Sequence, residues 1–142
     1  MPTRTASAEW NGSLADGKGR IKSQTGAIDQ AYDWKSRAGD GTLTNPEELL
    51  AAAHAGCFSM ALSHILGEAG FKPTKIATTA KVGFEKQGDG FAVTRIDLST
   101  EATIPGIDDA AFQKHANAAK AGCPISKALA SVPTITLAAK LV

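Results

Sequence analysis

The sequence predicts an α+β fold, in which strands and helices occur in separate runs rather than in strict alternation. Strand-like segments fill the first quarter of the chain, a long helix follows, and two strands, a helical stretch and a last strand complete it. The 142 residues suit a single domain over residues 1–142, long enough to bury a core without disulfide bonds.

The N-terminal segment "RTASAEWNGSLADGKGRIKSQTGAI" is typical of a β-hairpin. Its turn is expected near Ala15–Gly19, where "ADGKG" supplies Asp-Gly turn chemistry. Partial alternation of apolar and polar residues predicts a third strand over Ala31–Arg37, and "AGDGTLT" then forms a loop.

A long helix is expected to begin after this loop. Thr44 or Asn45 can cap it, and Pro46 suits the first helical position. Glu47 and Glu48 lie in the first turn, where the helix macrodipole favours anions.

The helix should end at Gly67 or Gly70, with Pro73 beyond. Its ~24 residues would span ~36 Å, more than twice the ~14 Å radius of gyration of a compact chain this long. Apolar residues point in nearly every direction around it: Leu49, Leu50, Ala53, Phe58, Met60, Leu62, Ile65 and Leu66. Because one small sheet covers only one side of a helix, we expect a second copy of the chain to cover the rest.

The remaining elements follow in order. Two strands are expected near Thr74–Lys86 and Phe91–Thr103, joined by "QGDG". A helix opens at "PGIDD" and continues to about Lys120, a short helix covers Pro124–Ala130, and Pro133–Leu141 forms the last strand.

Charge and hydropathy argue against two classes of partner. Fifteen basic and fourteen acidic residues give a net charge of +1 with no long basic run, which disfavours nucleic-acid binding. The N-terminus lacks an apolar signal-peptide core, and charged or histidine side chains interrupt the most apolar stretch. We therefore expect a soluble, cytoplasmic protein with no membrane partner.

The two cysteines, Cys57 and Cys123, lie 66 residues apart. Cys57 is either a structural thiol that fills space in the helix or a reactive one. Cys123 is either an ordinary cysteine in a turn or a thiol at the start of a helix, where the backbone N–H groups lower its pKa. The macrodipole fades within the first turn and burial raises a thiol pKa, so the helix cannot ionise Cys57. Lowering its pKa from ~8.5 to ~6 takes ~3.4 kcal/mol, which a cation from elsewhere must supply.

Arg37 and His54 are the candidate cations. Arg37 is the better candidate, because it keeps its charge and can bind a carboxylate with two N–H groups. Glu47 or Glu48 could supply that carboxylate and orient the arginine. Taken singly, each of these charges also suits an ordinary solvated position.

No zinc-ligand spacing, nucleophile elbow or glycine-rich phosphate loop is present, so we expect no metal or organic cofactor. Two other functions stay open. The chain could be a stress-associated binding protein with inert thiols, or an acyl transferase that pairs Cys57 with His54.

At this point the motifs "NPEELLAAAHAGCFSMAL" and, 66 residues after its cysteine, "GCPIS" resemble the OsmC/Ohr family of osmotically inducible, organic hydroperoxide-reducing proteins. The likeness extends over nearly the whole chain, through "GEAGFKPTKI" and "IPGID", and is closer to the OsmC branch than to the Ohr branch. The resemblance implies antiparallel sheets with a long central helix, in an intertwined homodimer whose two active sites lie at the subunit interface.

The implied activity is a thiol-dependent peroxidase that prefers organic hydroperoxides. By resemblance, Cys57 attacks the peroxide and becomes a sulfenic acid, and Cys123 resolves it as a disulfide. Arg37 would hold Cys57 as a thiolate, and Glu47 would hold Arg37. The reductant would be a small dithiol such as dihydrolipoamide on a carrier protein.

We also expect the residues that follow the attacking cysteine to form an apolar wall that favours alkyl peroxides. These residues are Phe58, Met60 and Leu62, together with the partner chain.

Overall fold

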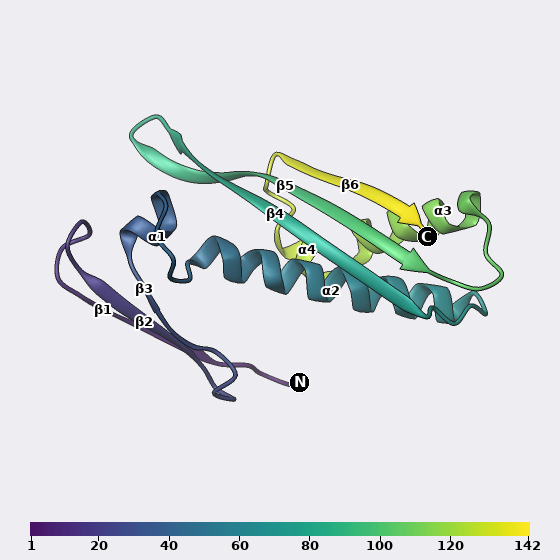
Figure 1. Ribbon diagram of the computed structural model, residues 1–142, viewed down its shortest axis with the longest axis horizontal. Coiled ribbons are helices and arrows are strands. Elements are labelled where there is room, and N and C mark those ends of the chain that lie inside the picture. The colour runs from purple at the N-terminus through teal and green to yellow at the C-terminus, as the bar shows by residue number, and fades with distance from the viewer. The chain divides into compact units, whose positions relative to one another are not determined.

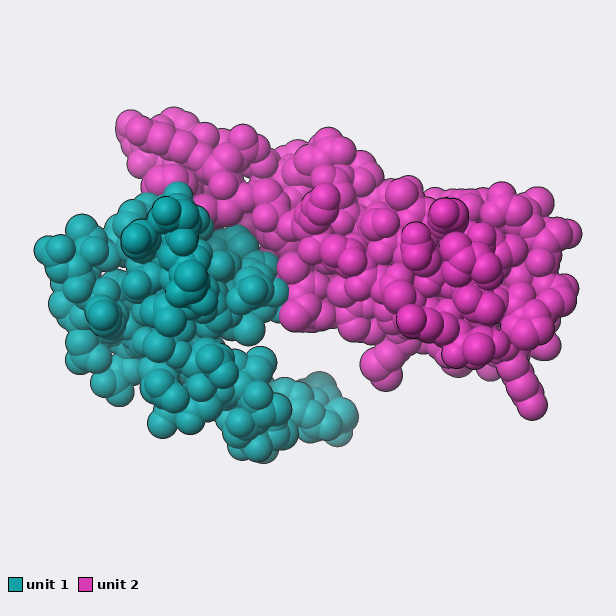
Figure 2. Space-filling view, in the orientation of Figure 1, with its two compact units in different colours: residues 1–49 teal, residues 50–142 magenta.

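The computed structural model describes residues 1–142, and its mixture of strands and helices confirms the α+β class (Figure 1). The elements in chain order are β1 (Ala6–Asn11), β2 (Lys18–Ser23), β3 (Asp29–Tyr32), α1 (Trp34–Ala38), α2 (Pro46–Glu68), β4 (Lys75–Gln87), β5 (Gly90–Thr103), α3 (Asp109–Gly122), α4 (Pro124–Ala128) and β6 (Thr134–Leu141). The chain divides into two compact units, residues 1–49 and 50–142, coloured separately in Figure 2.

The first unit contains an antiparallel sheet in the order β1-β2-β3. Trp10 and Tyr32 pack edge to face across the central strand, with ring centroids 5.3 Å apart. Gly19 lies between them, and a Cβ at this position would collide with both rings. The hairpin is where we expected it, but its connection spans residues 12–17 and opens on Gly12 at φ +97°, so Ala15–Gly19 was too late a placement for the turn.

The prediction of a strand over Ala31–Arg37 is wrong after its first two residues. Strand β3 ends at Tyr32, and the carboxylate of Asp33 accepts a hydrogen bond from the Ser36 N–H at 2.8 Å. This N-cap starts helix α1, so Arg37 lies on a short helix rather than at the end of a strand. A local capping interaction therefore outweighed the weak strand pattern.

Helix α2 begins as the sequence predicts. The Asn45 side chain caps it by accepting a hydrogen bond from the Glu48 N–H at 2.8 Å, whereas the Thr44 hydroxyl donates to the Glu48 carboxylate. The last helical residue is Glu68, and the chain turns at Gly70 with φ +88°. The N–H of Phe71 then bonds to the carbonyl of Leu66, as in a Schellman C-cap.

The second unit contains a sheet in the order β4-β5-β6. Strands β4 and β5 form the expected antiparallel hairpin, with Gln87 opposite Gly90. Strand β6 pairs with β5 in parallel, which differs from an all-antiparallel sheet. The reason is the intervening helical crossover through α3 and α4, which returns the chain to the end of the sheet from which β5 started.

The core of the second unit lies between this sheet, α2 and α3. The buried residues of α2 recur every four positions, as expected for one face of a helix, and those of β5 alternate. They are Phe58, Leu62 and Leu66 of α2, Ile96, Leu98 and Ala102 of β5, and Phe112, Ala116 and Ala119 of α3. Figure 1 shows the strands β4 and β5 running along α2 in this unit.

Much of α2 is apolar yet exposed in the single chain. Met60 is 76% exposed, and Ala53, Gly56 and Gly67 are exposed as well. By length and composition α2 could span a membrane, which is weak evidence because the core helix of a globular protein passes the same test. Within one chain only one face of α2 is buried, as the sequence predicts, and its cover by a second copy of the chain stays a prediction.

Candidate active site

Arg37 and Glu47 form an ion pair within the first unit. The Arg37 Nε donates to Glu47 Oε2 at 3.1 Å, and Nη2 donates to Oε1 at 2.8 Å. The Glu47 residue is only 8% exposed, while the Arg37 side chain is 36% exposed. This two-point contact fixes the plane of the guanidinium. Of the two candidate carboxylates, the structure pairs Glu47 with Arg37, and Glu48 interacts with Thr44 instead.

A pocket of about 200 Å³ lies beside this ion pair and is lined by Arg37 itself. The other lining residues come from β1, its turn, β3 and α1: Trp10, Leu14, Tyr32, Asp33 and Trp34. Most of these are aromatic or aliphatic, so the guanidinium lies against a largely apolar hollow.

The two cysteines meet within the second unit. Cys57 is on α2, and Cys123 separates α3 from α4, with its N–H bonded to the Ala119 carbonyl. Their Sγ atoms lie 2.8 Å apart and both thiols are free. A disulfide bond needs a separation of about 2.05 Å, so a small approach of the two sulfurs would close it. Cys57 is partly exposed and Cys123 is fully buried.

The surroundings of the two sulfurs act on them in opposite directions. Burial, together with the hydrogen bond to Cys123, raises the pKa of Cys57. Burial also opposes ionisation of Cys123, but interactions with Cys57, with the backbone N–H groups of Ser126 and Ile125 and with the Ser126 hydroxyl outweigh it and lower the Cys123 pKa. Within this unit, negative charge is therefore more stable on Cys123 than on Cys57.

His54 does not form the hydrogen bond to Cys57 that the acyl-transferase alternative requires. Its Nε2 lies 2.7 Å from the Ser126 hydroxyl, and its buried Nδ1 has no hydrogen-bond partner. Neither nitrogen pairs with Cys57, so the structure does not form a Cys–His nucleophile pair. The sequence analysis missed Ser126, although its position three residues after Cys123 in "CPIS" was the available signal.

The expected apolar wall is only partly present. Phe58 and Leu62 are fully buried in the core, so they cannot line an open substrate path. Met60 alone of the three lies at the surface.

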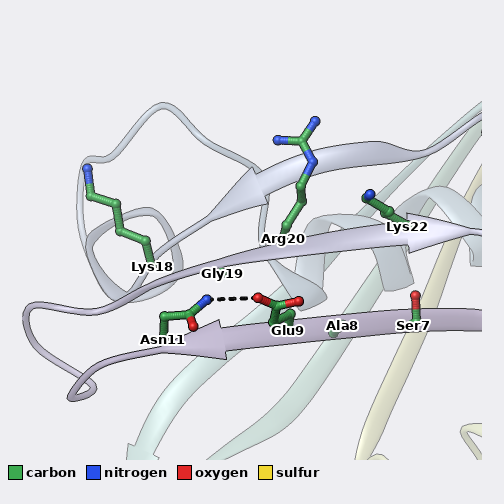
Figure 3. Close-up of a pocket in the computed structure, with 8 residues that line it drawn as sticks. All are labelled: Ser7, Ala8, Glu9, Asn11, Lys18, Gly19, Arg20 and Lys22. Carbon is green, nitrogen blue, oxygen red and sulfur yellow. Dashed lines mark hydrogen bonds between the residues drawn. The ribbon is translucent and has the colours of Figure 1, made fainter.

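Another pocket, of about 530 Å³, lies on the β1–β2 ribbon (Figure 3). Glu9 on β1 accepts a hydrogen bond from Asn11, and Lys18, Arg20 and Lys22 project from β2. This face contains no thiol, and we interpret its mixed charges as an ordinary solvated surface.

Comparisons with known proteins agree on one family. The family model described as OsmC-like protein matches residues 39–138. The chain is 48% identical to the peroxiredoxin OsmC of Escherichia coli over 129 residues, which cover 90% of each chain. It is 29% identical to the organic hydroperoxide resistance protein of Xanthomonas axonopodis pv. citri over 123 residues, 84% of each.

A solved structure gives the same result. The organic hydroperoxide resistance protein OhrB of Bacillus subtilis superimposes with a TM-score of 0.68 at 30% identity. The match covers 97% of this chain and 98% of that one.

Proposed function

The chain belongs to the OsmC family and is a peroxidase, and we propose that it reduces organic hydroperoxides to alcohols with Cys57 and Cys123 as its redox pair. The observation that carries this proposal is the 2.8 Å separation of two free sulfurs that lie 66 residues apart in the sequence. The name of the Escherichia coli relative supports a peroxide substrate, and that of the Xanthomonas relative supports an organic hydroperoxide.

The first step is attack by the Cys57 thiolate on the outer peroxide oxygen. The S–O bond forms as the O–O bond breaks, and the departing alkoxide takes a proton to become the alcohol. Cys57 is left as a sulfenic acid. Because burial raises the pKa of Cys57, this step needs a cation, which we assign to Arg37 held in orientation by Glu47.

The second step is condensation of the two cysteines. The Cys123 sulfur attacks the Cys57 sulfenic acid, an S–S bond forms, and water leaves. The lowered pKa of Cys123 favours this step, because the attacking species is the thiolate. The two sulfurs already lie close enough that no large rearrangement is needed.

The third step returns the disulfide to two thiols. We assign it to a small dithiol, such as dihydrolipoamide on a lipoylated carrier protein. A dithiol suits the reaction because its second thiol can release it from the mixed disulfide as an internal disulfide.

The pocket beside Arg37 supports an organic rather than an inorganic peroxide. Trp10, Leu14 and Trp34 line it, and an alkyl group would remove their surface from water. Hydrogen peroxide has no such group and gains nothing from these contacts.

We propose that the protein works as a cytoplasmic homodimer of a single domain. The exposed apolar surface of α2, with Met60 at 76% exposure, supports a second copy as its cover. The two compact units meet between residues 49 and 50 of the chain. Both the family match and helix α2 continue across this boundary, which supports one domain over residues 1–142.

Mass spectrometry after one equivalent of cumene hydroperoxide tests the proposal. We expect each chain to lose the mass of two hydrogen atoms and to yield a crosslinked peptide that contains Cys57 and Cys123. Two unmodified thiols after complete mixing would contradict the proposed function.

A further inference from the structure

A buried hydrogen bond links α2 to α4 beside the thiol pair. His54 lies one turn before Cys57 and is fully buried, and Ser126 is 8% exposed. The His54 Nε2 and the Ser126 Oγ are 2.7 Å apart, although 72 positions separate the two residues. The established peroxidase activity assigns no task to this contact.

The surroundings of the imidazole select its protonation state. Burial lowers the pKa of His54, so the ring is neutral at physiological pH and carries one N–H. A proton on Nδ1 would leave a buried N–H without an acceptor, and orphaned buried N–H groups are rarer than under-used acceptors. The proton therefore lies on Nε2 and is donated to the Ser126 oxygen.

This arrangement leaves the Ser126 hydroxyl hydrogen free to be donated to Cys123, which lies three residues before it. The Ser126 oxygen already accepts from His54, so its own O–H is available as a donor, and its interaction with the Cys123 sulfur favours the thiolate. A hydroxyl that accepts one hydrogen bond is polarised and becomes a better donor of the next. The chain of donors thus runs from His54 through Ser126 to Cys123.

We propose that His54 and Ser126 are positioning residues that make Cys123 the leaving thiolate when a dithiol reductant opens the Cys57–Cys123 disulfide. This inference rests on the proposed function. It follows from the His54–Ser126 hydrogen bond, from the position of Ser126 three residues after Cys123, and from access, since Cys57 is partly exposed while Cys123 is fully buried.

The reduction then proceeds in two exchanges. One reductant thiolate attacks the Cys57 sulfur, forming a mixed disulfide, and the electron pair of the broken S–S bond goes to Cys123. The second reductant thiolate attacks its partner sulfur in the mixed disulfide and releases Cys57 as a thiolate. The dithiol is oxidised by two electrons to an internal disulfide, and its two protons return the cysteines to thiols.

The first experiment titrates Cys123 alone, in full-length protein carrying Cys57→Ser, by the ultraviolet absorbance of its thiolate against pH. Ser126→Ala should raise the Cys123 pKa by about one unit, because it removes a hydrogen bond to a charged group. His54→Leu should raise it also, and His54→Gln, which keeps an N–H donor, should raise it less. Ser59→Ala is the matched control, since it removes another partly buried hydroxyl, bonded to Thr78.

The second experiment locates the reductant. Protein with both cysteines is oxidised with one equivalent of cumene hydroperoxide, treated with 2-mercaptoethanol, and quenched with N-ethylmaleimide. We expect the mercaptoethanol on Cys57 and the maleimide on Cys123. In stopped-flow reduction by dithiothreitol, Ser126→Ala should slow disulfide opening about threefold, and Ser59→Ala should not.

The two proposals fail in different ways. If Ser126→Ala moves the Cys123 titration no more than Ser59→Ala does, or if the adduct forms on Cys123, this inference is overturned while the peroxidase mechanism stands. If cumene hydroperoxide produces no Cys57–Cys123 disulfide, the proposed function fails, and the titration still measures the hydrogen-bond chain by itself.

Discussion

The Arg37–Glu47 ion pair and the Cys57–Cys123 thiol pair present opposite electrostatic situations. In the first pair, a carboxylate that is almost buried is matched by two N–H groups of a permanently charged guanidinium. In the second pair, a partly exposed thiol lies against a buried one, and the surroundings raise the pKa of Cys57, the thiol that attacks in the proposed mechanism. The Arg37–Glu47 pair is charged, whereas the thiol pair has no cation beside it in its own unit to stabilise a thiolate on Cys57.

This difference shows why neither pair is sufficient. Cys57 has nothing in its own unit that makes it a good nucleophile, apart from the Ile125 N–H, which burial and Cys123 outweigh. Arg37 and Glu47 have no redox chemistry of their own. The proposed mechanism therefore uses both pairs, and substitutions in each pair should have distinct effects.

The largest expected effect is the loss of the attacking sulfur. Cys57→Ser should reduce turnover of cumene hydroperoxide with dithiothreitol to the uncatalysed background, because a serine hydroxyl is not ionised at neutral pH. Hydroperoxide consumption measures it directly. Cys123→Ser should still reduce one equivalent, but turn over poorly and accumulate overoxidised Cys57. Substantial catalysis by Cys57→Ser would remove the thiol pair from the mechanism.

The next largest effect tests the other pair. Arg37→Gln should lower kcat/KM at pH 7 more than about tenfold, because loss of the guanidinium leaves a smaller fraction of Cys57 ionised at this pH. The pH profile should shift to higher pH. Arg37→Lys keeps the charge but loses the two-point contact with Glu47, so its kcat/KM should lie between those of the wild type and Arg37→Gln. An unchanged pH profile would show that Arg37 does not lower the pKa of Cys57.

A smaller effect is expected for the carboxylate that orients the guanidinium. Glu47→Gln should lower kcat/KM about tenfold, because a neutral amide then replaces the charged carboxylate that accepts the hydrogen bonds of Arg37. Glu48→Gln is the control, because Glu48 is exposed and contacts Thr44 rather than Arg37. Equal losses in the two variants, with equal folding, would show that the ion pair has no special role.

The smallest effect concerns stability. Burial lowers the pKa of His54 in the folded state, so between the folded and unfolded values the unfolded chain binds more protons. His54 therefore stabilises the fold above its unfolded pKa of about 6.5, and this contribution is lost as the pH falls. Urea unfolding from pH 8 to pH 5 should show a steeper loss in the wild-type chain than in His54→Gln. Parallel curves would contradict a buried neutral imidazole.

The sequence predicted best where local chemistry determines structure. Asn45 and Pro46 mark the start of α2 to the residue, and Gly70 terminates it through its positive φ. The hairpin of β4 and β5 follows from strong alternation on either side of "QGDG". These signals lie within a few residues of the feature they specify.

The sequence predicted less where the structure depends on contacts between segments that are far apart in the chain. Nothing in residues 134–141 says that β6 pairs in parallel with β5, because the pairing depends on the helical crossover before it. The contact of Cys57 with Cys123 could be expected only from family resemblance, and Ser126 was missed because its partner His54 is 72 residues away. In residues 33–38 two local signals compete: weak alternation predicts a strand, but the Asp33 side chain caps a helix, and the helix forms.

The most direct test is the alkylation rate of Cys57 by iodoacetamide against pH, measured in full-length Cys123→Ser protein with and without Arg37→Gln. We predict that Cys57 ionises well below the usual thiol pKa of about 8.5 when Arg37 is present and at or above it when Arg37 is replaced. A titration like that of free cysteine, or one that Arg37→Gln leaves unchanged, would contradict the account.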